Sequence, residues 1–214
     1  MATSAIDACP RELVAATSEP DIIKVPARSA LAIDGAGAPG NADFQTALQA
    51  LYGIAYTLKF TRKKARKGDF KVGALEGKWA AVGAASPPPP DAWRWRLRIA
   101  VPRDVTAREL DRVRRAALAK TGGTLAGNPR AGDVFLEKVP AARMGRILHV
   151  GPYADEPATF AKLAPLIAAE QPSPWHLEIY LSDPRRVAPA KLRTALFREL
   201  AARSRLKPAH AIAA

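Results

Sequence analysis

Residues 24–52 read KVPARSALAIDGAGAPGNADFQTALQALY, and residues 138–167 read KVPAARMGRILHVGPYADEPATFAKLAPLI. The two stretches start 114 residues apart and share one order of features. Each has a short extended segment, a turn, a second strand, a loop that contains Gly or Pro, and then an amphipathic helix. The sequence therefore predicts an internal duplication into two halves of about 100 residues, which fits a chain of 214 residues at about 150 residues per domain.

The helix of each copy has a start signal and an apolar stripe. Asn41 or Asp43 can cap the first helix, whereas Asp155 is the expected N-cap of the second, with Pro157 in its first turn. The expected stripes are Phe44, Leu48, Leu51 and Ala55 in the first helix, and Phe160, Leu163, Leu166 and Ile167 in the second. Each helix is therefore expected to cover one face of a sheet.

Two extended segments follow each helix. In the first half they are residues 70–83 and 91–102, separated by SPPPP at 86–90, whose prolines cannot pair inside a sheet. In the second half they are WHLEIYLSDP at 175–184 and KLRTALFREL at 191–200. The apolar residues of the last segment also suit a helix, but the repeat predicts a strand.

These elements predict an α+β fold. We expect two tandem strand–helix–strand–strand modules, at residues 21–104 and 124–200, with antiparallel sheets and the helices on one face. Pseudo-two-fold symmetry would then place a ligand cleft between the modules, which is a favoured position for a small-molecule site.

A helix at residues 106–121 is expected to join the modules. Thr106 and Glu109 form a capping box at its start, and Gly122 or Gly123 supplies the stop.

The two ends of the chain lie outside the modules. Residues 1–20 are expected to form a flexible arm, and residues 201–214 a flexible basic tail.

The chain is strongly basic. Its 33 Lys and Arg residues exceed its 20 Asp and Glu residues by 13, and seven cations lie in KFTRKKARKGDFK at 59–71, where we expect a solvated loop. A second basic feature is the alternation of Arg94, Arg96 and Arg98. Such charge attracts nucleic acid without specifying it, and a chain rich in Ala, Arg and Pro also carries surplus Arg through codon bias. Nucleic acid is therefore the partner that the sequence favours least.

Several classes of protein are excluded. Cys9 is the single cysteine, so neither an internal disulfide nor a cysteine-based metal site is expected. The sequence has no run of about 18 apolar residues, so neither a transmembrane helix nor a membrane partner is expected. The N-terminus shows no signal-peptide pattern, so the cytoplasm is the expected location. His149 and His176 have no third ligand at a recognisable spacing, so we expect no metal and no cofactor.

The strand WHLEIY at 175–180 carries the candidate site. Alternation places Trp175, Leu177 and Ile179 on one face and His176, Glu178 and Tyr180 on the other. We expect the module helix to cover the Leu177 face, so that Glu178 points into the groove between the modules.

Five motifs resemble the stand-alone GyrI-like small-molecule-binding proteins. In chain order they are ALYGIAYTLKF (50–60), LEGKW (75–79), WRWRLRI (93–99), HVGPYADEPATFAKL (149–163) and EIYLSDPRR (178–186). The resemblance runs from about Lys24 to about Arg198. It implies two strand–helix–strand–strand modules with a ligand cleft between them, as in the drug-sensing domains of some transcription activators.

The resemblance also implies a function. Members bind bulky aromatic or cationic compounds, and some are hydrolases that open the strained cyclopropane of DNA-alkylating natural products. The glutamate of the family's EIY motif lies in the cleft, and that position here is Glu178. As a general base, Glu178 would activate water while Tyr56 or Tyr180 donates a hydrogen bond to the developing oxyanion.

Other positions complete the expected site. Trp79, Trp95 and Tyr153 match motif positions that could form the walls of the cleft, and His176 could tune Glu178. The chain departs from the family pattern, which often has a double tryptophan after LEG and a double histidine before EIY. Here Lys78 precedes Trp79, and Leu177 follows His176, so the pocket is expected to differ in shape.

Three hypotheses follow from the sequence. The leading one is a protein that binds aromatic or electrophilic xenobiotics and hydrolyses them, providing resistance. The second is a non-catalytic module that sequesters a drug, or a regulatory module that contacts a protein such as DNA gyrase. The third is nucleic-acid binding through residues 59–71 and the Arg94, Arg96 and Arg98 face.

Overall fold

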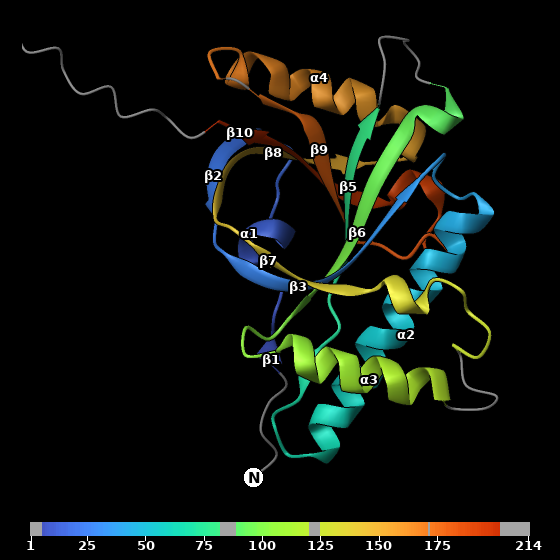
Figure 1. Ribbon diagram of the computed structural model, residues 1–214. Helices are drawn as coiled ribbons and strands as arrows, with labels where there is room; N and C mark the ends of the chain where they lie inside the picture. Colours follow the sequence, from blue (N-terminus) through green and yellow to red (C-terminus); the bar gives the residue numbers. More distant parts are fainter. Residues whose placement is uncertain (1–5, 82–88, 120–124, 171, 202–214) are drawn as a thin grey trace, which may run out of the picture.

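The computed structural model describes residues 6–81, 89–119, 125–170 and 172–201 (Figure 1). Its strands are β1 (Ile6–Asp7), β2 (Asp21–Val25), β3 (Arg28–Ala36), β4 (Phe70–Lys71), β5 (Leu75–Ala81), β6 (Trp93–Val101), β7 (Phe135–Val139), β8 (Ala142–Val150), β9 (Pro172–Tyr180) and β10 (Arg193–Leu200). Its α-helices are α1 (Arg11–Val14), α2 (Ala42–Lys64), α3 (Ala107–Ala119) and α4 (Glu156–Ile167). Short 3₁₀ turns lie at Pro90–Ala92, Ala131–Asp133, Tyr153–Asp155 and Pro189–Lys191.

Eight strands form one antiparallel sheet. Its order is β2-β8-β10-β9-β5-β6-β3-β7, while β1 and β4 pair in parallel as a small separate sheet. The α+β class and the antiparallel sheets predicted from the sequence are confirmed. The ambiguous segment at 191–200 is the strand β10, which pairs with both β8 and β9.

The elements of the two halves recur at the spacing seen in the sequence. β2 and β7, β3 and β8, and α2 and α4 each begin 114 residues apart. In the sheet, however, β2 pairs with β8 and β7 pairs with β3, so each half contributes its first strand to the other half. The two halves are therefore interleaved rather than independently closed.

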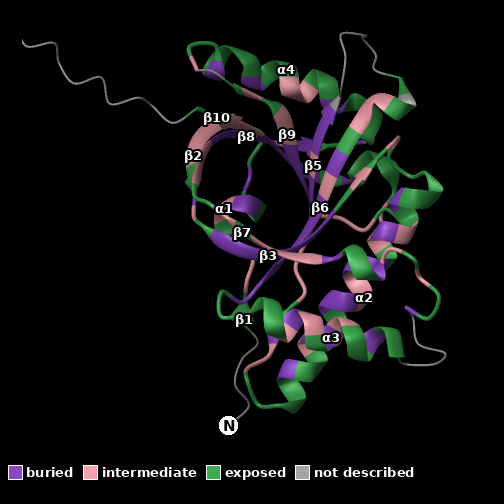
Figure 2. Ribbon diagram, viewed as in Figure 1, coloured by how far each residue is buried: buried purple, intermediate pink, exposed green. Residues whose placement is uncertain are grey.

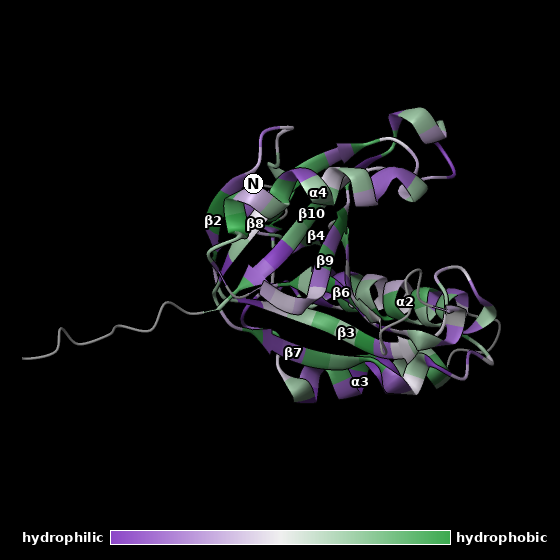
Figure 3. Cartoon of the chain, turned by 90° about the horizontal axis from the view of Figure 1, so that it is seen from above, coloured by the Kyte–Doolittle hydropathy of each residue, from purple (hydrophilic) through white to green (hydrophobic). Residues whose placement is uncertain are grey.

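The two module helices cover separate parts of one sheet face. α2 packs on β3 and β6, where it buries Leu51, Ile54 and Leu58, and α4 packs on β8, where it buries Leu163 and Ile167. Figures 1 and 3 both show α4 apart from α2 and α3. In Figure 2 the buried residues concentrate on the central strands.

The face of β9 that carries Leu177 and Ile179 was expected to lie under a module helix, and the structure does not place it there. Leu177 and Ile179 pack with Leu13 of α1, Met144 and Phe197, rather than under a module helix. The expectation of a flexible arm at 1–20 does not hold for α1, because its Leu13 is fully buried in this cluster. A short apolar segment supplies the cover that the curled sheet needs on this side.

The caps explain where the helices begin. The Phe44 N–H donates to Asn41 Oδ1 at 2.7 Å, so Asn41 is the N-cap of α2. Asp155 precedes α4, but its side chain makes no capping hydrogen bond. At α3 the Glu109 N–H donates to Thr106 Oγ1 at 3.2 Å, whereas the Glu109 carboxylate binds Arg62 instead of closing the capping box.

The expected loop at 59–71 begins later than predicted: residues 59–64 are the last turns of α2, and residues 65–69 form the turn that leads to β4. α2 continues to Lys64, because Lys and Arg favour helix and cations suit the negative end of the helix dipole. Gly122 and Gly123, most of the SPPPP tract and the tail beyond residue 201 lie outside the described residues. No helix in the described part of the chain is long and apolar enough to cross a membrane.

Candidate functional site

A row of paired residues crosses the sheet from α2 to α4. Across six strands it reads Ile33, Leu97, Gly77, Glu178, Leu196 and Ile147. Directly paired residues of antiparallel strands point to the same face of a sheet. Ile33 and Leu97 belong to the core under α2, and Leu196 and Ile147 to the core under α4. Glu178 is thus the one ionisable residue of this row, on the helix-bearing face between the two helices.

Both oxygens of the Glu178 carboxylate are held. Tyr180 donates its hydroxyl to Oε2 at 2.6 Å, and His176 Nε2 lies 2.9 Å from Oε1. The indole N–H of Trp79 in turn donates to the Tyr180 hydroxyl oxygen at 3.1 Å. Only 8% of Glu178 is exposed, so the chain from Trp79 through Tyr180 fixes a largely desolvated carboxylate.

Aromatic rings surround this carboxylate. The ring of His176 packs edge-on against Phe160 at 5.2 Å and against Trp93 at 6.3 Å between centroids. Tyr153 packs edge-on against Tyr180 at 5.9 Å. These rings come from β6, β9, α4 and the turn before α4, so both halves of the chain contribute to the site.

Glu156, the first residue of α4, lies against Glu178. Burial, and then the negative charge of Glu178, raise the pKa of Glu156 to about 8. Burial, followed by the charges of these two carboxyl groups, also raises the pKa of Tyr153. The environment therefore favours a protonated Glu156 at neutral pH, so the two neighbouring carboxyl groups can take different roles in acid–base chemistry.

Two buried oxygens beside this pair lack hydrogen-bond partners within the described residues. They are Glu156 Oε1 and Thr194 Oγ1, and Thr194 pairs with Tyr180 in the sheet. The Thr194 hydroxyl acts on the Glu156 carboxyl, so the two groups are neighbours, and buried polar atoms of this kind are satisfied by a neighbour, a water or a ligand.

Gly77 makes room for the hydrogen-bond chain. A Cβ at this position would lie 2.5 Å from Trp79 Nε1 and 3.1 Å from the Tyr180 hydroxyl. A side chain at residue 77 would therefore displace the groups that hold Glu178.

The structure brings together five of the expected site residues. Glu178, Tyr180, Trp79, His176 and Tyr153 form one cluster; with Glu156 we call it the Glu178 cluster. Glu156 was missed, although it lies inside the HVGPYADEP motif, because nothing in the linear sequence shows that α4 begins against β9.

Two expected site residues lie elsewhere. Tyr56 is 45% exposed and stacks between Tyr52 and Phe60 on the outer side of α2. The helix turns Ile54, Ala55 and Leu58 inward, and this periodicity places residue 56 outside.

Trp95 is a core residue, 1% exposed, which packs edge-on against Phe44. Gly35 leaves the space that the indole occupies, because a Cβ there would overlap it. Trp93, and Phe160 from the expected stripe of α4, take the place of Trp95 beside His176.

Glu178 lines neither of two other cavities. One, of about 490 Å³, lies between the end of α2 and the start of α3, and the other, of about 130 Å³, is lined by Lys78 and Trp175 among others. The smaller cavity is also lined by His176, which contacts the Glu178 carboxylate.

Two of the three arginines on the arginine face of β6 are paired with carboxylates, whereas Arg94 is exposed and donates to backbone carbonyl oxygens. Arg96 pairs with Asp34 at 2.6 Å and with Glu137 at 2.9 Å, and Arg98 pairs with Glu137 at 2.6 Å. Arg96 and Arg98 are therefore not free to bind a nucleic-acid backbone. Within the described residues no group of three His, Cys, Asp or Glu side chains could hold a metal ion.

The same fold occurs in solved structures. An uncharacterized conserved protein from Listeria innocua is 29% identical with a TM-score of 0.79, and the match covers 89% of this chain and 96% of that one. A hydrolase from Listeria innocua is 29% identical with a TM-score of 0.76 and the same coverage. The C-terminal domain of EcmrR shares the fold at 10% identity and a TM-score of 0.52, covering 86% of this chain and 97% of that domain. No family model matches the chain, and no curated protein does.

Proposed function

We propose that this chain is a GyrI-like protein that binds bulky aromatic or electrophilic small molecules at the Glu178 cluster and hydrolyses them, which protects the cell from xenobiotics. The observation that carries this proposal is the Glu178 carboxylate, buried among rings and held by Tyr180 and His176. The 29% identity to the Listeria hydrolase over nearly the whole chain supports hydrolysis.

The reaction that suits this cluster is the opening of a strained cyclopropane conjugated to a carbonyl. Glu178 accepts a proton from water as the water oxygen bonds to a ring carbon. The carbon–carbon bond of the cyclopropane breaks, and its electron pair moves through the conjugated system to the carbonyl oxygen. That oxygen then takes a proton, so the product is an alcohol with an enol or phenol.

The proton for that oxygen comes from Glu156 in this scheme. The Tyr180 hydroxyl already donates to Glu178, so Tyr180 positions the base rather than serving as the acid. Glu156 has a buried oxygen without a partner in the described residues and a pKa raised to about 8, so it holds its proton at neutral pH. This assignment gives the two carboxyl groups opposite roles.

The scheme predicts how turnover depends on pH. The protein should convert a cyclopropane-bearing alkylator with incorporation of one oxygen atom from ¹⁸O-labelled water, followed by mass spectrometry. Because a raised pKa leaves Glu156 protonated below about 8 and charged above it, turnover should fall as the pH rises through about 8. In Glu156→Gln, which has no proton to lose, this alkaline decline should disappear.

Two results would count against the scheme. Absence of labelled product at any pH would remove the hydrolase proposal. An alkaline decline that persists unchanged in Glu156→Gln would remove Glu156 as the acid.

A non-catalytic binding protein is the second candidate. A carboxylate enclosed by rings attracts organic cations, and the rings add about 0.5–2 kcal/mol of cation–π energy. The observation that favours this candidate is that both Glu178 oxygens are already hydrogen-bonded. Saturable binding of an aromatic cation without any product would support it.

A further inference from the structure

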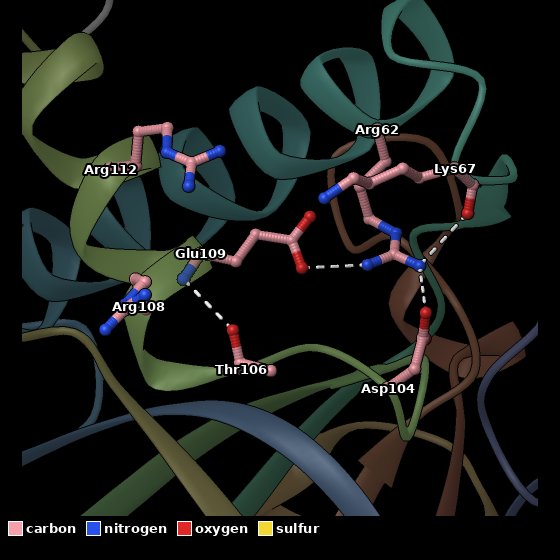
Figure 4. Close-up of a pocket in the computed structure, with 7 residues that line it drawn as sticks. All are labelled: Arg62, Lys67, Asp104, Thr106, Arg108, Glu109 and Arg112. Atoms are coloured by element: carbon pink, nitrogen blue, oxygen red, sulfur yellow. Dashed lines mark hydrogen bonds and ion pairs between the residues drawn. The ribbon is translucent and has the colours of Figure 1, made fainter.

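A cavity of about 490 Å³ separates the end of α2 from the start of α3 (Figure 4). The charged residues that line it are the cations Arg62, Lys67, Arg108 and Arg112 and the carboxylates Asp104 and Glu109. It lies beside the basic stretch that the sequence singled out and that the Glu178 cluster does not use. The lining groups carry a surplus of two positive charges.

Arg62 uses both of the carboxylates. Its guanidinium binds Glu109 at 2.9 Å and Asp104 at 2.6 Å, and it also donates to the Lys67 carbonyl oxygen at 3.1 Å. Arg62 is only 3% exposed and the Glu109 side chain 12%, so this pair forms a buried floor, while Asp104 lies exposed at its edge. Its Nε is buried and has no hydrogen-bond partner in the described part of the chain.

The other three cations are uncompensated. Within the described residues the side chains of Lys67, Arg108 and Arg112 form no hydrogen bond or ion pair. In Figure 4 the side chains of Lys67 and Arg112 extend from opposite walls toward the same space above Glu109. Like charges that converge on a hollow repel each other, and an anion between them removes that repulsion.

The helix adds to the same field. The first turn of α3, a helix of 13 residues, opens at this cavity with Thr106 as its cap. The positive end of the helix dipole favours anions there. Arginine side chains offer the paired N–H groups that match phosphoryl oxygens.

We propose that this cavity binds a small anion that carries two or more phosphoryl groups. Cations on two separate walls call for an anion with more than one charged centre. Nucleic acid fits less well, because Arg96 and Arg98, which could extend the basic surface, are paired with Asp34 and Glu137. Four cations from the end of α2, the turn after it and α3 line one hollow, which suits a compact polyanion.

Pyrophosphate titrated calorimetrically into the full chain at low salt tests this site. The wild type should bind it saturably, and Arg112→Ala should weaken binding about tenfold by removing one charge-assisted contact. Arg115→Ala is the matched control: it removes the same charge from the same helix at an exposed position outside the cavity lining, and should change affinity less than about twofold. Glu178→Gln should leave pyrophosphate binding unchanged.

Three outcomes would overturn the proposal. The first is that pyrophosphate does not bind the wild type saturably, and the second is that Arg115→Ala weakens binding as much as Arg112→Ala. The third is that a single-stranded oligonucleotide binds through Arg112 and is not displaced by pyrophosphate, which would make this surface a nucleic-acid site. Because Ala is the best helix former, unchanged thermal unfolding of both variants should show that the fold is intact.

Discussion

Glu178→Gln should lower the turnover of a cyclopropane-bearing alkylator by about 10²–10⁴-fold with little change in KM. The amide keeps the shape of the carboxylate and can still hydrogen-bond Tyr180, but it cannot accept a proton from water. The rings around Glu178 are unchanged, so the substrate should still bind. Steady-state kinetics at pH 7, with product followed by mass spectrometry, measure both quantities.

A matched substitution controls for the loss of a negative charge. Glu19→Gln makes the same chemical change at an exposed side chain and should retain wild-type turnover. If Glu178→Gln turns over as fast as Glu19→Gln, Glu178 is not the base, even if the protein is a hydrolase.

Arg28→Met should destabilise the fold by about 3–5 kcal/mol. Arg28 at the start of β3 binds Glu76 of β5 through two contacts of 3.0 and 2.5 Å, and Glu76 is fully buried. Burial disfavours the charge on Arg28, but Glu76 outweighs this and raises the pKa of Arg28. Removing the arginine leaves a carboxylate in the interior without its counter-charge. Denaturant unfolding measures the loss.

A double variant distinguishes the effect of an unpaired Glu76 charge from the effect of the packing that Arg28 loses. Arg28→Met with Glu76→Gln should recover much of the stability, because no unpaired charge remains. Arg11→Met, at an exposed position, should stay within about 0.5 kcal/mol of the wild type. A double variant as unstable as Arg28→Met would show that the charge is not the cause.

Local patterns in the sequence were sufficient for much of the fold. The alternation in residues 175–180 correctly separates Glu178 from Leu177, because a strand has a period of two wherever it lies. The repeat correctly assigned the segment at 191–200 to a strand although its leucines also suit a helix. Of the two caps that the sequence offered for α2, Asn41 and Asp43, the structure uses Asn41, and the choice was limited to these two because capping depends on neighbouring residues.

The features of the fold that could not be predicted from the sequence depend on contacts between residues far apart in the chain. The exchange of β2 and β7 between the halves has no local signal, and neither has the cover that Leu13 provides for Leu177. Trp93 and Trp95 share one strand parity, yet only Trp93 lies beside His176. Gly35 on the neighbouring strand has no side chain, and the Trp95 indole occupies the space that this leaves in the core.

In the candidate site, too, the local features could be predicted from the sequence and the long-range contacts could not. Glu178, His176 and Tyr180 follow one another on a single strand, so their common face could be predicted. Glu156 meets them only because α4 starts beside β9, and its raised pKa depends on that burial.

A crystal structure of Glu178→Gln soaked with the intact alkylator would show where the substrate binds. We expect ligand density inside the Glu178 cluster, with the cyclopropane facing residue 178 and the carbonyl oxygen facing Glu156. Density only elsewhere, such as on the Tyr52–Tyr56–Phe60 side of α2, with the rings still closed over residue 178, would contradict it.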